Sequence, residues 1–173
     1  MQQVNIIKNH YQTLGFTLIE LVIVIVLIGI LSVVALPRII NLTTQARQAA
    51  ASGIAGGLAA AVVVAHAQWV ASGNPTSISL EGKTIYLSPV VAGVGGWPED
   101  TVALGTNTAT ATKCLAVWNG ILNSPPPAAT GTCTGTCQYL VSVTSSPVCN
   151  FISQQGAGYT ITYNISTGAV VGP

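Results

Sequence analysis

Apolar residues are concentrated near the N-terminus of the chain, in one unbroken run. Residues 16–36 read FTLIELVIVIVLIGILSVVAL and contain a single charged side chain, Glu20. A helix rises about 1.5 Å per residue, so a run of this length spans the roughly 30 Å hydrocarbon core of a bilayer. The pattern therefore predicts a membrane-spanning helix at residues 16–36, preceded by a short polar segment at residues 1–15.

A second helical pattern follows this apolar run. Residues 39–72 are dominated by alanine, the best helix former, and the Gly73-Asn74-Pro75 sequence is a strong signal for a helix end. We therefore expect one long helix over residues 16–72. Pro37 is expected to bend this helix, because proline lacks the amide hydrogen that a helix interior uses.

The alanine-rich half of the helix carries a face of small residues. Gly53 and Gly57 lie four residues apart with alanines around them, and such a face allows another backbone to approach closely. We favour packing of this face on the chain's own sheet; the alternative is a helix–helix contact between copies. His66 and Trp69 share one side of the helix, where we expect them to be packing residues and not metal ligands.

The pattern changes from helical to β after Pro75. Segments rich in β-branched and aromatic residues alternate with loops of Thr, Ser, Gly and Pro, and the apolar stretch Cys114–Leu122 fits a short helix. The expected strands are Thr84–Leu87, Gln138–Val143, Asn150–Ser153, Tyr159–Ile165 and Ala169–Val171. The predicted fold class is α+β, with a β-rich head at residues 73–173 whose antiparallel sheet packs on the second half of the long helix.

Charged residues make up only 5% of the chain, against about 25% in a typical soluble domain. Five Lys and Arg residues against four Asp and Glu residues give a net charge of +1, which provides no basic patch for a nucleic acid. The sequence also lacks a nucleophile–base pair, a carboxylate dyad and a cluster of metal ligands. We therefore expect no catalytic residues, no metal and no cofactor.

The four cysteines all follow the apolar run, which predicts an oxidising compartment and two disulfides. Cys133 and Cys137 are close enough in sequence to close a small glycine-containing loop, which leaves Cys114 to pair with Cys149. A disulfide closing a loop of about 35 residues contributes roughly 3–4 kcal/mol in the chain-entropy model. We favour this pairing; the alternative joins Cys114 to Cys133 and Cys137 to Cys149.

The residues at the start of the apolar run form a specific motif. The sequence GFTLIEL at residues 15–21, followed by a membrane-length apolar run, resembles the class III signal of type IV pilins and related pseudopilins. The resemblance implies a pilin fold and cleavage between Gly15 and Phe16 by a prepilin peptidase, which removes residues 1–15 and methylates the amine of Phe16. It also implies that Glu20 docks incoming subunits by pairing with the Phe16 amine of a neighbour.

The same resemblance assigns a role to two helix-breaking residues. In pilins, a glycine and a proline at these distances from the mature start bracket a stretch that loses its helical structure when the subunit enters the filament. Gly29 and Pro37 occupy those positions here. The resemblance therefore implies that residues 29–37 melt on assembly.

Scattered blocks further along the chain are similar to the mannose-sensitive haemagglutinin type pilins. These blocks are Ala35–Leu42, Cys114–Leu122 and Tyr159–Tyr163. The resemblance implies a structural subunit that polymerises with identical copies into a surface filament for attachment. It further implies pilus assembly machinery in the inner membrane of a Gram-negative bacterium and export to the extracellular surface.

The alternative function is a pseudopilin of a type II secretion system. Major pseudopilins commonly carry a calcium site of clustered acidic residues in the β region. The only acidic pair in this chain is Glu99-Asp100, and four cysteines are more typical of a pilin. The sequence therefore favours the pilin.

Overall fold

The computed structural model describes residues 15–91, 93–102, 105–156 and 158–173, and within this range it leaves the side chains of residues 37–41 undescribed. Nearly all of the predicted leader, residues 1–15, thus lies outside the described part. The chain divides into two compact units, Met1–Leu42 and Thr43–Pro173. We call the second one the head unit.

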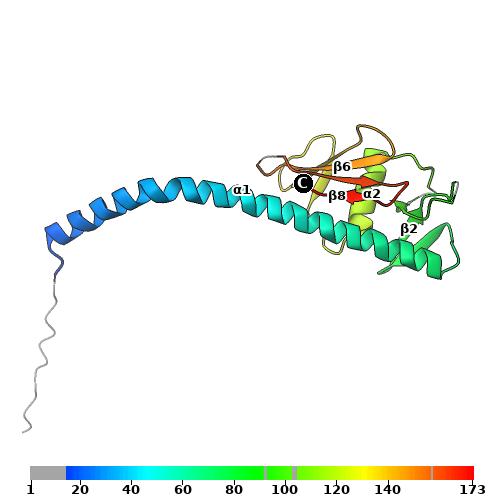
Figure 1. Cartoon of the computed structure of the whole chain (residues 1–173), viewed down its shortest axis with the longest axis horizontal. Coiled ribbons are helices and arrows are strands. Elements are labelled where there is room, and N and C mark those ends of the chain that lie inside the picture. The colour runs from blue at the N-terminus through cyan, green and yellow to red at the C-terminus, as the bar shows by residue number, and fades with distance from the viewer. Residues whose placement is uncertain (1–14, 92, 103–104, 157) are drawn as a thin grey trace, which may run out of the picture. The chain divides into compact units, whose positions relative to one another are not determined.

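Helix α1 (Leu18–Ala71) is continuous through the positions of Gly29 and Pro37 (Figure 1). It begins two residues after the predicted start at residue 16 and ends one residue before the predicted end at residue 72. Gly73 adopts a left-handed φ of 80° directly after it, as a C-terminal cap glycine does. The apolar run located the start of this helix to within two residues, and the alanines followed by Gly-Asn-Pro located its end to within one.

In the head unit, one side of α1 is buried at positions that alternate by four and three residues, the spacing of a helix face that packs on a core. The buried residues are Ala51, Ala55, Leu58, Val62, Ala65 and Trp69. Gly53 and Gly57 lie on the other side, exposed and with open space around their Cα atoms. Our expectation that these glycines pack on the chain's own sheet is therefore wrong. Larger apolar side chains one or two positions away bury more surface, and they set which side of the helix faces the core.

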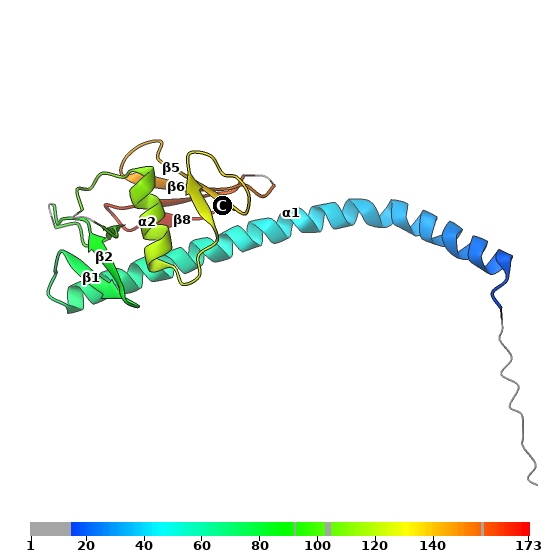
Figure 2. The same ribbon diagram turned by 180° about the vertical axis from the view of Figure 1, so that it is seen from behind.

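The main sheet of the head unit has five strands in the order β4-β5-β6-β7-β8. Figure 2 shows β5, β6 and β8 of this sheet. Strands β5 to β8 form the expected antiparallel meander, whereas β4 runs parallel to β5. The strands are β4 (Ala128–Thr130), β5 (Tyr139–Ser142), β6 (Val148–Ser153), β7 (Thr160–Asn164) and β8 (Val170–Val171). Burial alternates along β5, β6 and β7, so one face of the sheet is buried.

A second, three-stranded antiparallel sheet contains β1 (Ser77–Leu80), β2 (Lys83–Leu87) and β3 (Pro98–Asp100) in that order. The sequence indicated only β2 of these strands, and it did not indicate β4 either. The segment of β3 contains a proline and two carboxylates, residue types that are depleted in strands. It becomes a strand because Tyr86 and Leu87 of β2 pair with it, which is a tertiary contact.

Helix α2 (Ala111–Ile121) is the short helix expected at Cys114–Leu122, but it begins three residues earlier and ends one residue earlier. Thr110 caps it by accepting a hydrogen bond from the Lys113 amide. Both helices contribute to the core under the buried face of the five-stranded sheet. Leu58 and Val62 come from α1, and Val117 and Trp118 from α2. A smaller cluster around Ile85 lies between α1 and the three-stranded sheet.

Two disulfides are present, and they join the pairs that the cysteine spacing favoured. Cys114 is bonded to Cys149 with Cα atoms 5.6 Å apart, and Cys133 is bonded to Cys137 with Cα atoms 5.4 Å apart. The first links α2 to β6 in the core, where both residues are fully buried. The alternative pairing of the four cysteines is therefore wrong.

Candidate functional site

The start of α1 brings together residues of the predicted docking motif. Thr17 precedes the first helical residue, and its amide and hydroxyl donate hydrogen bonds of 2.9 and 2.8 Å to Oε2 of Glu20. The Glu20 amide donates in return to Oγ1 of Thr17 at 3.3 Å. This reciprocal arrangement is a capping box. The Glu20 carboxylate therefore has a partner within the chain, which is the N-terminus of its own helix.

The apolar surface that follows is uncovered. The large apolar side chains between Phe16 and Leu36 are 42% to 85% exposed. Two segments of α1 are long and apolar enough to cross a bilayer, Leu18–Leu36 and Leu42–Ala71. None of the first is buried, whereas 28% of the second is, because the second segment contributes to the core of the head unit. The first segment therefore exposes an apolar surface of the kind that lipid or another protein surface covers.

Inside the head unit, the Glu99 carboxylate is fully buried and has four partners. Lys113 Nζ lies 2.7 Å from Oε1, the Thr106 amide donates to Oε1 at 2.7 Å, and the Asn107 amide donates to Oε2 at 3.0 Å. The fourth partner is the Thr106 hydroxyl. Burial by itself raises the pKa of Glu99, but these hydrogen bonds favour the charged form and hold the pKa below its usual value. The carboxylate thereby ties β3 to the loop before α2.

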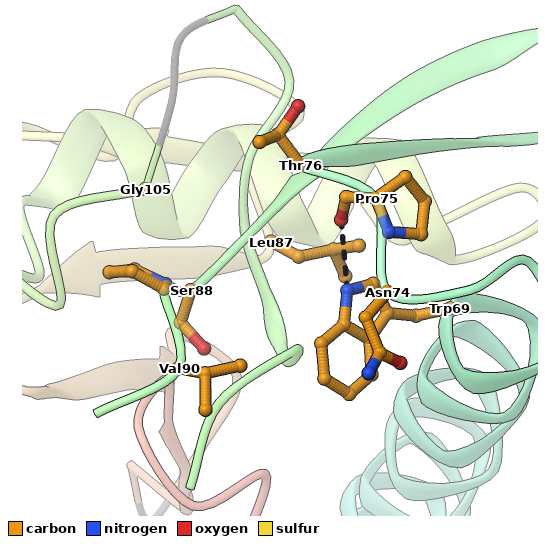
Figure 3. Close-up of a pocket in the computed structure, with 9 residues that line it drawn as sticks. Trp69, Asn74, Pro75, Thr76, Leu87, Ser88, Val90 and Gly105 are labelled. Atoms are coloured by element: carbon orange, nitrogen blue, oxygen red, sulfur yellow. Dashed lines mark hydrogen bonds between the residues drawn. The ribbon is translucent and has the colours of Figure 1, made fainter. Parts of the chain in front are cut away.

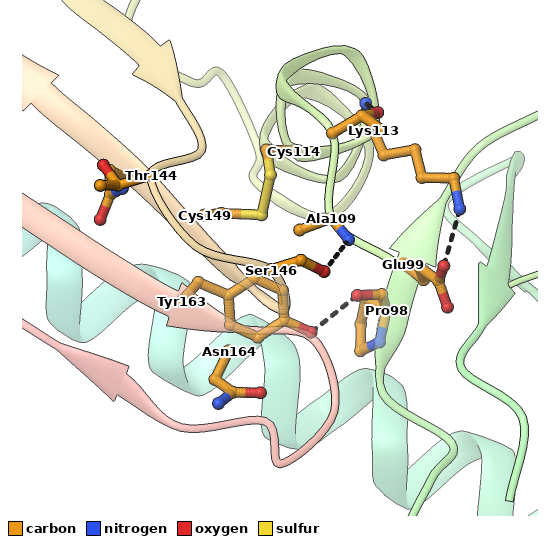
Figure 4. The surroundings of a disulfide bond; sticks show 12 residues. Pro98, Glu99, Ala109, Lys113, Cys114, Thr144, Ser146, Cys149, Tyr163 and Asn164 are labelled. Atoms are coloured by element: carbon orange, nitrogen blue, oxygen red, sulfur yellow. Dashed lines mark hydrogen bonds and ion pairs between the residues drawn. A yellow bond between two sulfur atoms is a disulfide. The ribbon is translucent and has the colours of Figure 1, made fainter. Parts of the chain in front are cut away.

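Tyr163 lies in the same part of the core (Figure 4). Its hydroxyl donates a 2.7 Å hydrogen bond to the Pro98 carbonyl. Burial raises the pKa of Tyr163 well above its usual value, and the nearby Glu99 carboxylate adds to the effect. The phenol therefore stays neutral and acts as a fixed donor that joins β7 to β3.

The Cys114–Cys149 disulfide lies beside this network. Figure 4 shows it on the side of α2 that faces the sheet, with the Ser146 hydroxyl accepting a hydrogen bond of 3.0 Å from the Ala109 amide close by. The two sheets and α2 are thus connected by the Cys114–Cys149 disulfide, the Glu99–Lys113 ion pair and the Tyr163 hydrogen bond. Among the described residues, the charged and polar groups of this interior are bonded to one another or to the backbone.

His66 on α1 also has a structural environment. Its ring stacks on Trp97 with centroids 3.8 Å apart, and its Nδ1 lies 2.9 Å from the Gly96 carbonyl. The Trp97 ring also lies against Gly168, where an added Cβ would overlap the ring atoms. The stack thus connects α1, the loop before β3 and the turn before β8, in agreement with the expectation that His66 is a packing residue.

A pocket of about 340 Å³ opens next to the end of α1. Trp69 forms one wall, and its indole Nε1 donates to the Pro75 carbonyl at 2.9 Å (Figure 3). The remaining lining residues are Asn74, Thr76, Leu87, Ser88, Pro89, Val90 and Gly105. None of the described residues that line this pocket has a charged or titratable side chain.

The structure brings Phe16 and Glu20 into one region, at the start of α1, with Phe16 85% exposed. Thr17 is the residue that the sequence analysis missed there, although the Thr-x-x-Glu spacing of a capping box could have indicated it. The ion pair of Glu99 with Lys113 was also missed. The two residues are 14 positions apart with an irregular segment between them, so no periodicity signals the contact.

Comparisons with known proteins give three significant relatives. The chain is 52% identical over 62 residues to a type IV narrow pilus major component, PilA5, of Thermus thermophilus, covering 36% of this chain. It is 34% identical over 111 residues, 60% of this chain, to a fimbrial protein of Neisseria meningitidis serogroup B. A fimbrial protein of Neisseria meningitidis serogroup A is 38% identical over 87 residues, 46% of this chain.

The matched regions cover 52%, 64% and 51% of the lengths of these three relatives, respectively. No family model matches the chain, and no solved structure matches it at a significant level. The similarity is therefore to proteins named for pili and fimbriae, over roughly half to two thirds of their length.

Proposed function

We propose that this chain is the precursor of a structural subunit of a type IV pilus. Three relatives that are named as a pilus component or as fimbrial proteins support this function. The α+β fold, with a long apolar N-terminal helix whose second half packs on a sheet, fits the same function. The subunit polymerises with identical copies, and no enzymatic step by the chain itself is needed.

The observation that carries the proposal is the uncovered apolar segment at residues 18–36. A soluble protein that exposed so many large apolar side chains would aggregate. In the proposed cycle the segment first lies in the inner membrane, where lipid covers it. In the filament, the same segments of other copies cover it, so that one surface serves both the anchored precursor and the assembled core.

Maturation begins at the junction of Gly15 and Phe16. A prepilin peptidase removes residues 1–15 and methylates the new amine of Phe16. This amine is positively charged and lies four residues before Glu20. The amine of one copy can therefore pair with the Glu20 carboxylate of a neighbouring copy. Because Thr17 holds that carboxylate in the precursor, docking exchanges an intramolecular capping contact for an ion pair in a low-dielectric environment, where ion pairs are stronger.

The stretch from Gly29 to Pro37 is helical in the isolated chain. In the filament we propose that it loses helical structure. Gly29 weakens the helix and Pro37 cannot donate a helical hydrogen bond, so this stretch is less costly to open than the flanking segments. Opening it would allow the apolar segments of neighbouring copies to pack without changing the head unit.

The assembled filament is proposed to lie on the outer surface of a Gram-negative cell and to serve adhesion or attachment. The mannose-sensitive haemagglutinin type pilins are the proposed subgroup. The alternative function, a pseudopilin of a type II secretion system, is less favoured. Glu99 is engaged by Lys113 and by backbone amides, and Oδ1 of Asp100 accepts hydrogen bonds from the Thr101 and Val102 amides, so both carboxylates already have partners inside the chain.

A charge-removing variant of the docking residue tests the proposal. Glu20→Gln keeps a side chain that can complete the capping box but removes the charge that would pair with the Phe16 amine. We expect normal leader cleavage, measured by the mass of the mature chain, and loss of surface filaments in electron micrographs. Abundant normal filaments from Glu20→Gln would contradict the docking role.

Deletion of the gene separates the candidate functions. Loss of long surface filaments together with loss of attachment agrees with a pilin. Filaments that persist while protein secretion fails would instead indicate a pseudopilin. The complemented wild-type strain is the control, because it must restore whichever phenotype is lost.

A further inference from the structure

The head unit contains six charged side chains, and four of them have a partner inside the chain. Glu99 and Lys113 form the buried ion pair. Asp100 accepts hydrogen bonds from backbone amides, and Lys83 Nζ donates to the Asn119 carbonyl at 2.7 Å. The remaining two, Arg47 and Glu81, are exposed, and their side chains form no hydrogen bond or ion pair with any residue that the structure describes.

Arg47 is one of the residues that line a cleft on the surface of the head unit. The cleft is lined by Ala50, Ile54, Gln138, Tyr139, Ser153 and Gln155. Gly156 has a φ of 85°, and a Cβ there would come within 2.6 Å of the Arg47 guanidinium. The loop after β6 thus leaves room for the guanidinium, whose planar donors remain available for a bidentate carboxylate.

Glu81 is an unusual residue for its position. Leu80 pairs with Lys83 across the β1–β2 hairpin, so Glu81 and Gly82 form a two-residue turn in which φ is 48° and 81°. Such turns favour Asn, Asp or Gly at the first position, because a larger side chain is strained at positive φ. Glu81 is thus unfavourable for this turn, and its side chain gains no hydrogen bond or ion pair with the described residues that would compensate. Such a residue points to a role outside the chain.

The two residues cannot meet within one copy. Glu81 borders an apolar pocket of about 200 Å³ together with Ala60 and Val64 of α1, whereas Arg47 is thirteen residues before Ala60 on the same helix. At 1.5 Å per residue this separation is about 20 Å, far beyond the reach of an ion pair. The two side chains therefore cannot pair with each other inside one copy.

We propose that Arg47 of one copy pairs with Glu81 of a neighbouring copy in the filament. The inference rests on the proposed function and adds an interaction between head units to it. Arg47 and Glu81 lie on different patches, so the contact is heterologous and can repeat without closing. If neighbouring α1 helices run parallel, the pairing shifts each copy by about 20 Å along the helix axis.

Charge reversal tests the contact. Arg47→Glu and Glu81→Arg each place like charges together, which is costly at an interface, so each should lower the amount of filament sheared from cells by at least about tenfold. The double variant restores the pair in reverse and should return the yield to near the wild-type value. Lys83→Gln, a charge change in the same hairpin, is the control and should have little effect.

The variant Glu81→Asn distinguishes loss of the contact from misfolding of the head unit. Asparagine suits the first position of this turn better than glutamate does, so the head unit stays folded while the charge is lost, and filament yield should still fall. Wild-type yield from Glu81→Asn, or from both reversal variants, would overturn the contact. Lost filaments that the double variant fails to restore would also overturn it, because Arg47 and Glu81 would then have other partners.

A cysteine pair provides an independent readout. In filaments of a chain with both Arg47→Cys and Glu81→Cys, an intramolecular bond is ruled out because a disulfide needs Cα atoms within about 7 Å. Oxidation should therefore give a ladder of dimers and larger species on a non-reducing gel. Filaments without a ladder would overturn this contact alone, whereas a wild-type chain that forms no filaments would overturn the proposed function and this contact with it.

Discussion

At the scale of single residues, the head unit uses its few charges for structure. Glu99 is fully buried, and a buried carboxylate is destabilising unless hydrogen bonds and an opposite charge compensate for its lost hydration. Lys113 and two backbone amides provide that compensation. Because Glu99 joins β3 to the loop before α2, a strand with poor intrinsic propensity depends on this side chain.

The lowered pKa of Glu99 predicts an acid-sensitive head unit. Between the folded-state pKa and the ordinary value of 4.5, the unfolded chain binds more protons than the folded one, so stability rises with pH. The contribution of Glu99 is fully present above pH 4.5 and is lost as the pH falls through the folded-state pKa. Urea unfolding of the full chain in detergent, followed by tryptophan fluorescence, measures this loss.

The matched variant for this experiment is Glu99→Gln. It should unfold about 2 kcal/mol more easily at neutral pH, because hydrogen bonds to a charged group are lost. Its stability should then depend less on pH in the acid range than that of the wild-type chain. Equal acid sensitivity of the two chains would mean that other carboxylates are responsible.

At the scale of elements, α1 has two sides with different tasks in the head unit. The side with Leu58 and Val62 is fully buried against the sheet and α2. The opposite side, with Gly53, Gly57 and Val63, is exposed. The first side is needed for folding, and the second remains available for contacts between copies.

Variants of two adjacent valines, one on each side of α1, test this difference. Val62→Ala should lower the free energy of unfolding by about 2 kcal/mol, because it removes buried methyl groups and leaves a cavity. Val63→Ala makes the same chemical change at a position that is 62% exposed, and it should change stability by less than about 0.5 kcal/mol. Urea unfolding of both variants measures the difference, and equal losses would contradict the assignment of the two sides.

At the scale of the whole molecule, the two units differ in what they need from their surroundings. The head unit, Thr43–Pro173, has its own core, two disulfides and two sheets. In the first unit, the large apolar side chains described between residues 18 and 36 are all exposed. The folding of the head unit and the environment of the first unit are therefore separable properties.

A chain that begins at Thr43 tests this separation. We expect it to fold in water without detergent and to unfold with a free energy within about 1 kcal/mol of the full chain, because no core contact is removed. Circular dichroism and urea unfolding measure both properties, with the full chain in detergent as the control. A chain from Thr43 that is unfolded would show that residues before it stabilise the head unit.

The sequence by itself determined the features that depend on local pattern. The apolar run, the alanine-rich helix with its Gly73 end, α2 and strands β2 and β5 to β8 all follow from periodicity, composition and turn residues. The spacing of the cysteines also favoured the disulfides Cys114–Cys149 and Cys133–Cys137. Such signals are readable because each arises from residues that are near one another in the chain.

Only the tertiary structure decided the features that depend on distant residues. Strand β3 exists because β2 pairs with it, and Glu99 can be buried because Lys113 reaches it from another element. The choice of which side of α1 faces the core was also tertiary, since apolar area on Leu58 and Val62 outweighed the small-residue face at Gly53 and Gly57. Burial and long-range pairing are collective properties, and no window of sequence contains both partners.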